Sequence, residues 1–180
     1  FFSFHFVTNI EKFKSKDFND CFLKYNKTSN EIELHITCYD GCLYRQRSIY
    51  QKLCAELGRN HGFNFIRDEK NGLLRYKNLY IHTEKLSLED YQRLITSATV
   101  AICPSDQEGY GHYINESRYF KTFILTIDAE PMNELVNNIN GKLIRVKEKM
   151  LKQRLIDETG FEMFKVIPNI NDMRDKIKYC

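Results

Sequence analysis

The most informative segment of this 180-residue chain reads Ile102-Cys103-Pro104-Ser105-Asp106-Gln107-Glu108-Gly109-Tyr110-Gly111-His112-Tyr113-Ile114-Asn115-Glu116. The unbroken apolar run 98–103 that leads into it is typical of a parallel strand covered on both faces. Pro104 ends this strand because proline cannot donate a hydrogen bond to a neighbouring strand. The segment therefore predicts a buried strand, a glycine-bearing loop and the start of a helix.

The loop and the helix start have the chemistry of an anion site. Gly109 and Gly111 permit tight turns and a close approach of the backbone to a ligand. The first N–H groups of the following helix, at the positive end of its dipole, favour a phosphate there. His112 and Glu116 are four residues apart and so share one face of the helix. We expect N–H donors for a pyrophosphate and carboxylates for sugar hydroxyls.

Glu108 and Glu116, with seven residues between them after Pro104-Ser105, resemble the E-x7-E motif of retaining nucleotide-sugar glycosyltransferases of the GT-B fold, family 4 and its relatives. The run 124–135 looks like the next strand, loop and helix of that family, and the resemblance covers residues 79–146. The sequence of residues 111–116 is similar to a segment of glycosyltransferases from large DNA viruses. The resemblance implies a C-terminal, donor-binding domain that uses a UDP-, GDP- or ADP-sugar.

The resemblance also implies roles for single residues. Glu116 would accept hydrogen bonds from the ribose hydroxyls. Glu108 would hold the transferred sugar and support positive charge at its anomeric carbon, which is the catalytic role. The diphosphate would be bound by the loop and helix start, and the donor or sugar by the downstream run: Gly109, Tyr110, Gly111 and His112, then Met132, Asn133 and Glu134. Base contacts are expected near His82, Thr83 and Leu86.

One segment departs from the family pattern. Members follow their first strand with a glycine turn and basic residues that clamp the diphosphate, whereas Val7 to Lys16 lacks the glycine. Lys12 or Lys14 could supply the charge, or the run could be a solvated helix start. The N-terminal domain with which family members bind an acceptor (a glycan, protein or lipid) is absent from these residues, so we expect this chain alone to bind a nucleotide or sugar nucleotide but to turn over poorly. No metal is expected, because no Asp-x-Asp pair is present.

Composition narrows the class of protein. The length fits one domain over residues 1–180, and the first residue is Phe1, which indicates a piece of a longer protein. A net charge of +3 with scattered charges gives no footprint for nucleic acid. No apolar run is long enough for a transmembrane helix, and no secretory signal is present. The irregular spacing of 6 cysteines favours a reduced, cytoplasmic protein, and Cys38 with Cys42 lacks the second pair that a zinc site needs.

Strand and helix patterns alternate along the chain, which favours an α/β fold: a doubly wound, Rossmann-like parallel sheet of about six strands with helices on both faces. Strands are expected at 2–7, 31–38, 79–82, 98–103, 122–127 and 142–146, the last of them. Helices are expected at 11–25, 44–57, after Ser87, after Gly111, from Pro131 and at 172–178, while 59–77 shows only turn signals.

Other functions stay open. A non-catalytic GT-B relative that binds a nucleotide sugar would fit the altered lysine segment. A sugar-nucleotide epimerase or a phosphorylase would use the same fold, although no cofactor lysine for a phosphorylase is identifiable. A doubly wound domain without a nucleotide site is the remaining alternative, because a fold does not imply a function.

Overall fold

The computed structural model describes residues 2–7, 32–37, 54–55, 57–59, 62–70, 72–77, 79–84, 86–104, 110–151, 164–178 and 180. Contacts divide the chain into two compact units, Phe1–Ile102 and Cys103–Cys180. The prediction of a single domain over residues 1–180 stays a prediction. Each unit is described below by itself.

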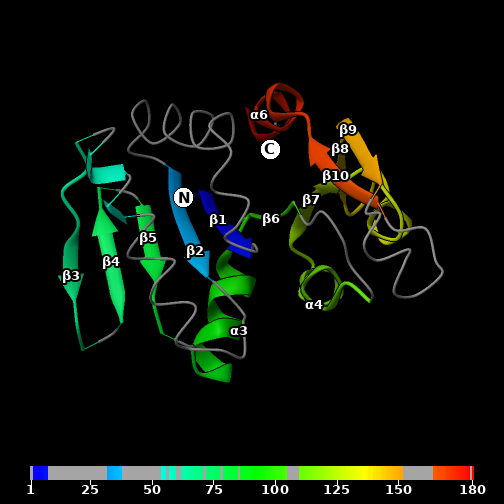
Figure 1. Ribbon diagram of the computed structural model, residues 1–180. Coiled ribbons are helices and arrows are strands. Elements are labelled where there is room, and N and C mark those ends of the chain that lie inside the picture. Colours follow the sequence, from blue (N-terminus) through cyan, green and yellow to red (C-terminus); the bar gives the residue numbers. More distant parts are fainter. Residues whose placement is uncertain are drawn as a thin grey trace, which may run out of the picture. The chain divides into compact units, whose positions relative to one another are not determined.

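The first unit is built on parallel strands. β1 (Phe2–Val7) lies between β2 (Ile32–Thr37) and β6 (Val100–Cys103), and it is parallel to both. β5 (Leu79–His82) pairs in parallel with the other edge of β2 (Figure 1). β6 is buried along its whole length, as its unbroken apolar sequence predicts.

Two antiparallel strands extend this sheet and were not predicted. β3 (Ile66–Asp68) pairs with β4 (Leu73–Tyr76), and β4 pairs with β5, so that the order in this unit is β3-β4-β5-β2-β1-β6. The backbone reverses at Gly72 and Lys77, which have positive φ angles of 56° and 53°. The turn signals in 59–77 were therefore correct, but the strands between them are too short to show a period.

Helix α3 (Leu88–Ser97) follows β5 and contacts β1. Its predicted cap is confirmed, because the Ser87 hydroxyl accepts a hydrogen bond of 3.0 Å from the Asp90 N–H. Ile95 is its buried anchor. The helical positions 54–55 and 57–59 agree with the predicted helix 44–57, although the helix continues past Gly58. The predicted helix 11–25 lies outside the described residues.

The second unit has helices on both faces of a parallel pair. β7 (Phe123–Ile127) pairs with β8 (Gly141–Ile144). Helix α4 (His112–Tyr119) contacts β7, and α6 (Ile170–Lys178) contacts β8 from the opposite side (Figure 1). The residues of β7 from Ile124 to Ile127 are all buried, as covering on both faces requires. The predicted α/β class with a parallel sheet between helices is confirmed.

Three boundaries in this unit correct the predictions. The strand at 142–146 is not the last, because β8 ends at Ile144 and the chain continues into an antiparallel pair, β9 (Val146–Leu151) and β10 (Phe164–Pro168). The helix expected from Pro131 is only a 3-10 turn, η2 (Met132–Glu134). The last helix begins at Ile170, two residues early, because the Asn169 side chain accepts a hydrogen bond of 3.1 Å from the Asp172 N–H. Among the described residues, no helix is long and apolar enough to cross a membrane.

Candidate functional site

The start of α4 is the centre of the candidate site. Gly111 is its N-cap residue, with φ 69° and ψ 47°, the left-handed region that glycine tolerates best. A Cβ atom at this position would lie 2.8 Å from Cδ1 of Leu135, in the loop after β7. The left-handed conformation therefore favours glycine, and a side chain there would also displace the end of the Leu135 side chain in the β7–β8 connection.

This helix start has no side-chain cap. The Gly111 carbonyl accepts hydrogen bonds of 3.0 Å from the N–H groups of Ile114 and Asn115, which closes the first turn. The N–H groups of Gly111 and His112 have no hydrogen-bond partner in the described part of the chain. Two donors at the positive end of a helix dipole are the groups that would bind a phosphate.

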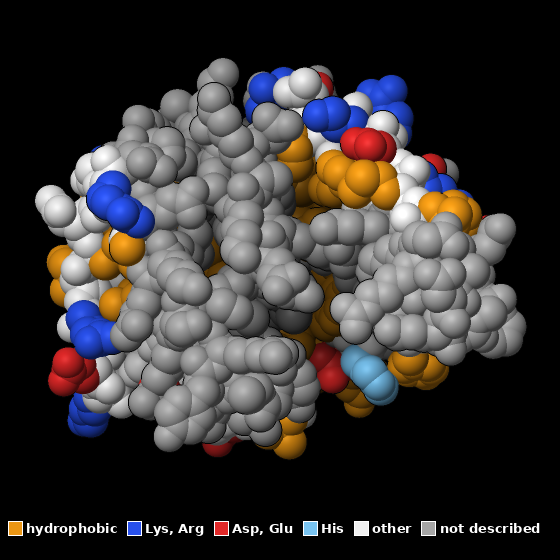
Figure 2. All heavy atoms as spheres, viewed as in Figure 1, with side chains coloured by type: hydrophobic (Ala, Val, Ile, Leu, Met, Phe, Trp, Pro, Cys, Tyr) orange, Lys and Arg blue, Asp and Glu red, His pale blue; other side chains and the backbone are white. Residues whose placement is uncertain are grey.

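The two faces of α4 are divided as the sequence predicts. His112 and Glu116 are exposed, whereas Ile114 and Ser117 are buried and Tyr113 is half-buried. Figure 2 shows a histidine at the surface beside acidic and hydrophobic side chains. Because His112 and Glu116 are both exposed and four residues apart in α4, the two side chains lie on the same face of the helix.

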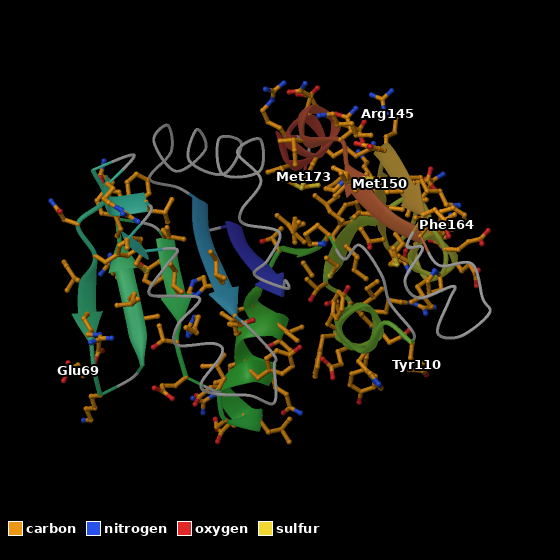
Figure 3. All side chains as sticks on the ribbon, in the orientation of Figure 1. Glu69, Tyr110, Arg145, Met150, Phe164 and Met173 are labelled. Carbon is orange, nitrogen blue, oxygen red and sulfur yellow. The ribbon has the colours of Figure 1, made fainter. Side chains whose placement is uncertain are left out.

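Tyr110 precedes the helix and lies beside α4 in Figure 3. It is 69% exposed, and its ring centroid lies 5.0 Å from that of His112. Its backbone carbonyl accepts a hydrogen bond of 3.1 Å from the Asn115 side chain. Asn115 was not predicted as part of the site.

The connection after β7 carries the other predicted donor contacts. The Met132 side chain is buried, so any contact with a ligand would come from its backbone. Asn133 is half-buried: its amide donates to Asp128 Oδ1 at 3.2 Å, and its own Oδ1 is buried without a hydrogen-bond partner among the described residues. Glu134 is exposed. Leu135, next to it, is the residue that contacts Gly111.

The predicted base contacts lie in the first unit. His82 ends β5, and its Nε2 lies 3.1 Å from Nδ1 of His35, whose ring stacks on Tyr80 with centroids 4.6 Å apart. Burial, together with the nearby His35, lowers the pKa of His82 to about 4. The hydroxyl of Thr83 donates to the Gly72 carbonyl at 2.8 Å. His82 and Thr83 are therefore held within the protein, and their role toward a base stays a prediction.

Four predicted site residues lie outside the described residues: Glu108, Gly109, Lys12 and Lys14. The catalytic role of Glu108 and the lysine clamp therefore stay predictions. Within the described ranges, no group of three or more His, Cys, Asp or Glu side chains is placed to hold a metal ion.

No family model matches the chain, and no curated protein matches it. Among solved structures, the C-terminal domain of a glycosyl transferase group 1 family protein (LpcC) from Francisella tularensis matches with a TM-score of 0.53 and 14% identity, over 88% of this chain and 73% of its own. A protein assigned as a UDP-N-acetylglucosamine 2-epimerase from Listeria monocytogenes matches with a TM-score of 0.51 and 13% identity, over 80% of this chain. This chain spans only 32% of the epimerase.

An α,α-trehalose-phosphate synthase (UDP-forming) from Burkholderia vietnamiensis matches with a TM-score of 0.47, which is too low to support an argument. At identities of 13% and 14%, the two better matches show the fold alone. The chain has the fold of a GT-B C-terminal domain, as the sequence predicts.

Proposed function

We propose that this chain is the donor-binding domain of a retaining glycosyltransferase of the family 4 type. In this proposal it binds a nucleoside-diphosphate sugar (a UDP-, GDP- or ADP-sugar) and, together with an acceptor-binding N-terminal domain, transfers the sugar with retention of configuration. One observation carries the proposal: an uncapped helix start behind Gly111, with Glu116 exposed in the same helix, occurs on a fold shared with a glycosyltransferase domain.

We assign the diphosphate of the donor to the start of α4. The N–H groups of Gly111 and His112 donate to its oxygens, and the dipole of α4 adds to the attraction. The hydroxyls of the ribose donate to the Glu116 carboxylate, a charge-assisted hydrogen bond of the stronger kind. Lys12 or Lys14 balances the remaining phosphate charge. These groups bind the diphosphate without a metal ion.

The transferred sugar is assigned to Glu108, the first glutamate of the motif, and to the β7–β8 connection. Glu108 accepts hydrogen bonds from sugar hydroxyls and stabilises the positive charge that develops at the anomeric carbon. Asn133, Glu134 and the backbone of Met132 line the sugar's far side. In this proposal the chain alone binds the donor but transfers slowly, because the acceptor site belongs to the N-terminal domain. The acceptor is a glycan, a protein or a lipid. The resemblance of residues 111–116 to glycosyltransferases of large DNA viruses stays a prediction.

A calorimetric titration with UDP, GDP and ADP tests the proposal. We expect saturable binding of one nucleotide, and a loss of about 1–3 kcal/mol of binding free energy in Glu116→Ala, the range for a polar contact left unpaired. Glu148→Ala is the matched control, because Glu148 is an exposed glutamate of β9 in the same unit. Absence of binding by all three nucleotides, or equal affinities of Glu116→Ala and the wild type, would contradict the proposal.

A sugar-nucleotide epimerase is the second candidate, favoured by the fold shared with the protein from Listeria monocytogenes. It predicts the same nucleotide site but a different product. Incubation with UDP-N-acetylglucosamine, followed by proton NMR of the anomeric signals, separates the two. An epimerised nucleotide sugar without any acceptor would favour the epimerase, and unchanged substrate would favour the transferase or a non-catalytic binding module.

A further inference from the structure

The two described helices that follow parallel strands begin in different ways. At α3, the Ser87 hydroxyl accepts a hydrogen bond from the Asp90 N–H, so the cap uses one of the free N–H groups of the first turn. At α4, Gly111 has no side chain and makes no such bond. A capping serine or aspartate at that position would compete with a bound anion for the same N–H groups.

The start of α4 is instead held from the carbonyl side. Asn115, in the second half of the first turn, directs its Nδ2 back to the carbonyl oxygen of Tyr110 at 3.1 Å. Its Oδ1 accepts a hydrogen bond of 3.0 Å from the guanidinium of Arg118, one turn further along. Because both ends of the amide are engaged, the side chain is fixed in one orientation, with the donor toward Tyr110.

This bond has a consequence for the next N–H group. The Tyr110 carbonyl and the Gly111 N–H belong to one planar peptide unit, and in a trans peptide they point in opposite directions. A donor that fixes the carbonyl therefore fixes the direction of the N–H. The left-handed conformation of Gly111 leaves this peptide few other restraints, because glycine adopts many backbone conformations at low cost.

We infer that Asn115 is a positioning residue for the donor diphosphate: it orients the Gly111 N–H toward the phosphate without occupying any N–H group of the helix. This inference rests on the proposed function. Asn115 does not touch the nucleotide, and it acts through the Tyr110–Gly111 peptide. An aliphatic residue at this position would leave the peptide free to rotate, so that part of the binding free energy would be spent on ordering it.

The test compares a nucleoside diphosphate with its parent nucleoside, using NMR titrations of the full chain that reach millimolar affinities. The base and ribose contacts are common to both ligands, and only the diphosphate uses the Gly111 N–H. In Asn115→Ala we expect about tenfold weaker binding of the diphosphate, and a change of less than about twofold for the nucleoside. Asn115→Asp keeps the acceptor for Arg118 but loses the donor, and we expect at least the same selective loss.

Arg118→Met is the matched control, because it removes the guanidinium and keeps the bond from Asn115 to Tyr110. We expect it to weaken the diphosphate by less than about threefold. The hydrogen bond from Asn115 to Tyr110 is exposed, so water can replace it in the two Asn115 variants. We therefore expect both Asn115 variants to fold, and circular dichroism checks this.

Equal losses for nucleoside and diphosphate would assign Asn115 a merely structural role, and unchanged diphosphate affinity in both Asn115 variants would also overturn the inference. If Glu116→Ala weakens binding but the Asn115 variants do not, the proposed function stands and only the inference fails. If the wild type binds no nucleotide, the proposed function fails and the inference falls with it.

Discussion

Arg145 and Asp172 are joined by two hydrogen bonds of 2.8 Å, in which the backbone N–H and the Nε of Arg145 each donate to one carboxylate oxygen of Asp172. Arg145 follows β8, and Asp172 lies in the first turn of α6. Lys176, one turn further along α6, also donates to this carboxylate. The Asp172 side chain is only 8% exposed, so these bonds fix the end of the strand to the helix that covers it; Figure 3 labels Arg145 near α6.

Replacing Asp172 with alanine should lower the free energy of unfolding by about 2–3 kcal/mol, because the Arg145 N–H and the Lys176 ammonium lose a shared buried acceptor. Urea denaturation measures the change. Asp175→Ala is the control: Asp175 is half-exposed and pairs with Arg174 at 3.4 Å, and a pair of this kind contributes less than about 1 kcal/mol. Similar losses of unfolding free energy in the two variants would show that the hydrogen bonds of Asp172 do not stabilise the fold as described.

The Asp172 carboxylate should also make the fold less stable in acid. Burial tends to raise the pKa of Asp172, but the hydrogen bonds from Lys176 and Arg145 outweigh it and hold the pKa below its ordinary value of 3.8. The folded state therefore releases this proton more readily than the unfolded state. The stabilisation is complete above the ordinary pKa and is lost as the pH falls through the lowered one.

Thr126 is predicted to hold the end of β6. Its hydroxyl donates a buried hydrogen bond of 2.9 Å to the carbonyl of Cys103, the last residue of the strand before Pro104. Thr126→Val keeps the shape but removes this buried hydrogen bond, so the free energy of unfolding should fall by about 1–2 kcal/mol. Thr96→Val, at an exposed position of α3, should change stability by less than about 0.5 kcal/mol. A Thr126→Val variant as stable as the wild type would refute this role.

Lys121 offers a stabilising substitution. It follows α4 with φ 59°, in the left-handed region that costs a residue with a side chain about 1 kcal/mol relative to glycine. Lys121→Gly should therefore raise the free energy of unfolding by about 0.5–1 kcal/mol. Lys121→Ala removes the charge but keeps the strain, so it should give no comparable gain. Thermal denaturation compares the melting temperatures of the two variants. A glycine variant that melts at a lower temperature than the alanine variant would contradict the prediction.

The pair of His82 and His35 predicts a second pH effect, in a different range. With a folded pKa of about 4 against 6.5 when unfolded, His82 takes up a proton on unfolding throughout this window. Stability is therefore full above pH 6.5 and falls as the pH drops toward 4, by about 2 kcal/mol between pH 7.5 and pH 5. His82→Gln should lose this part of the pH dependence. Parallel curves for the variant and the wild type would show that His82 is not the group responsible.

Local patterns predicted the elements whose signals are short-range. β5 matches its prediction at both ends, because Leu79 and Ile81 are buried and the residues that follow are polar. The cap at Ser87 and the buried β6 were also found, since each depends on a few neighbouring residues. The antiparallel strands were missed because they depend on distant partners: Tyr76 stacks on Phe63 with centroids 4.2 Å apart, and Lys149 lies 4.1 Å from the ring of Phe164.

The candidate site was predictable to the same extent. The need for glycine at position 111 and the shared face of His112 and Glu116 follow from turn chemistry and helical spacing. Asn115 was not predicted as a site residue. Asparagine has only a weak helix propensity, which says nothing about the group that its side chain contacts. The bond from Asn115 to Tyr110 joins the helix to the residue before Gly111, a contact that helical spacing within the sequence does not indicate.

The central claim is that a nucleoside diphosphate binds at the start of α4, and a crystal structure of the chain with the nucleotide that binds most tightly tests it most directly. We predict phosphate oxygens within hydrogen-bonding distance of the Gly111 and His112 N–H groups, and ribose hydroxyls on the Glu116 carboxylate. A nucleotide bound elsewhere, with Glu116 in contact with no part of it, would contradict the account.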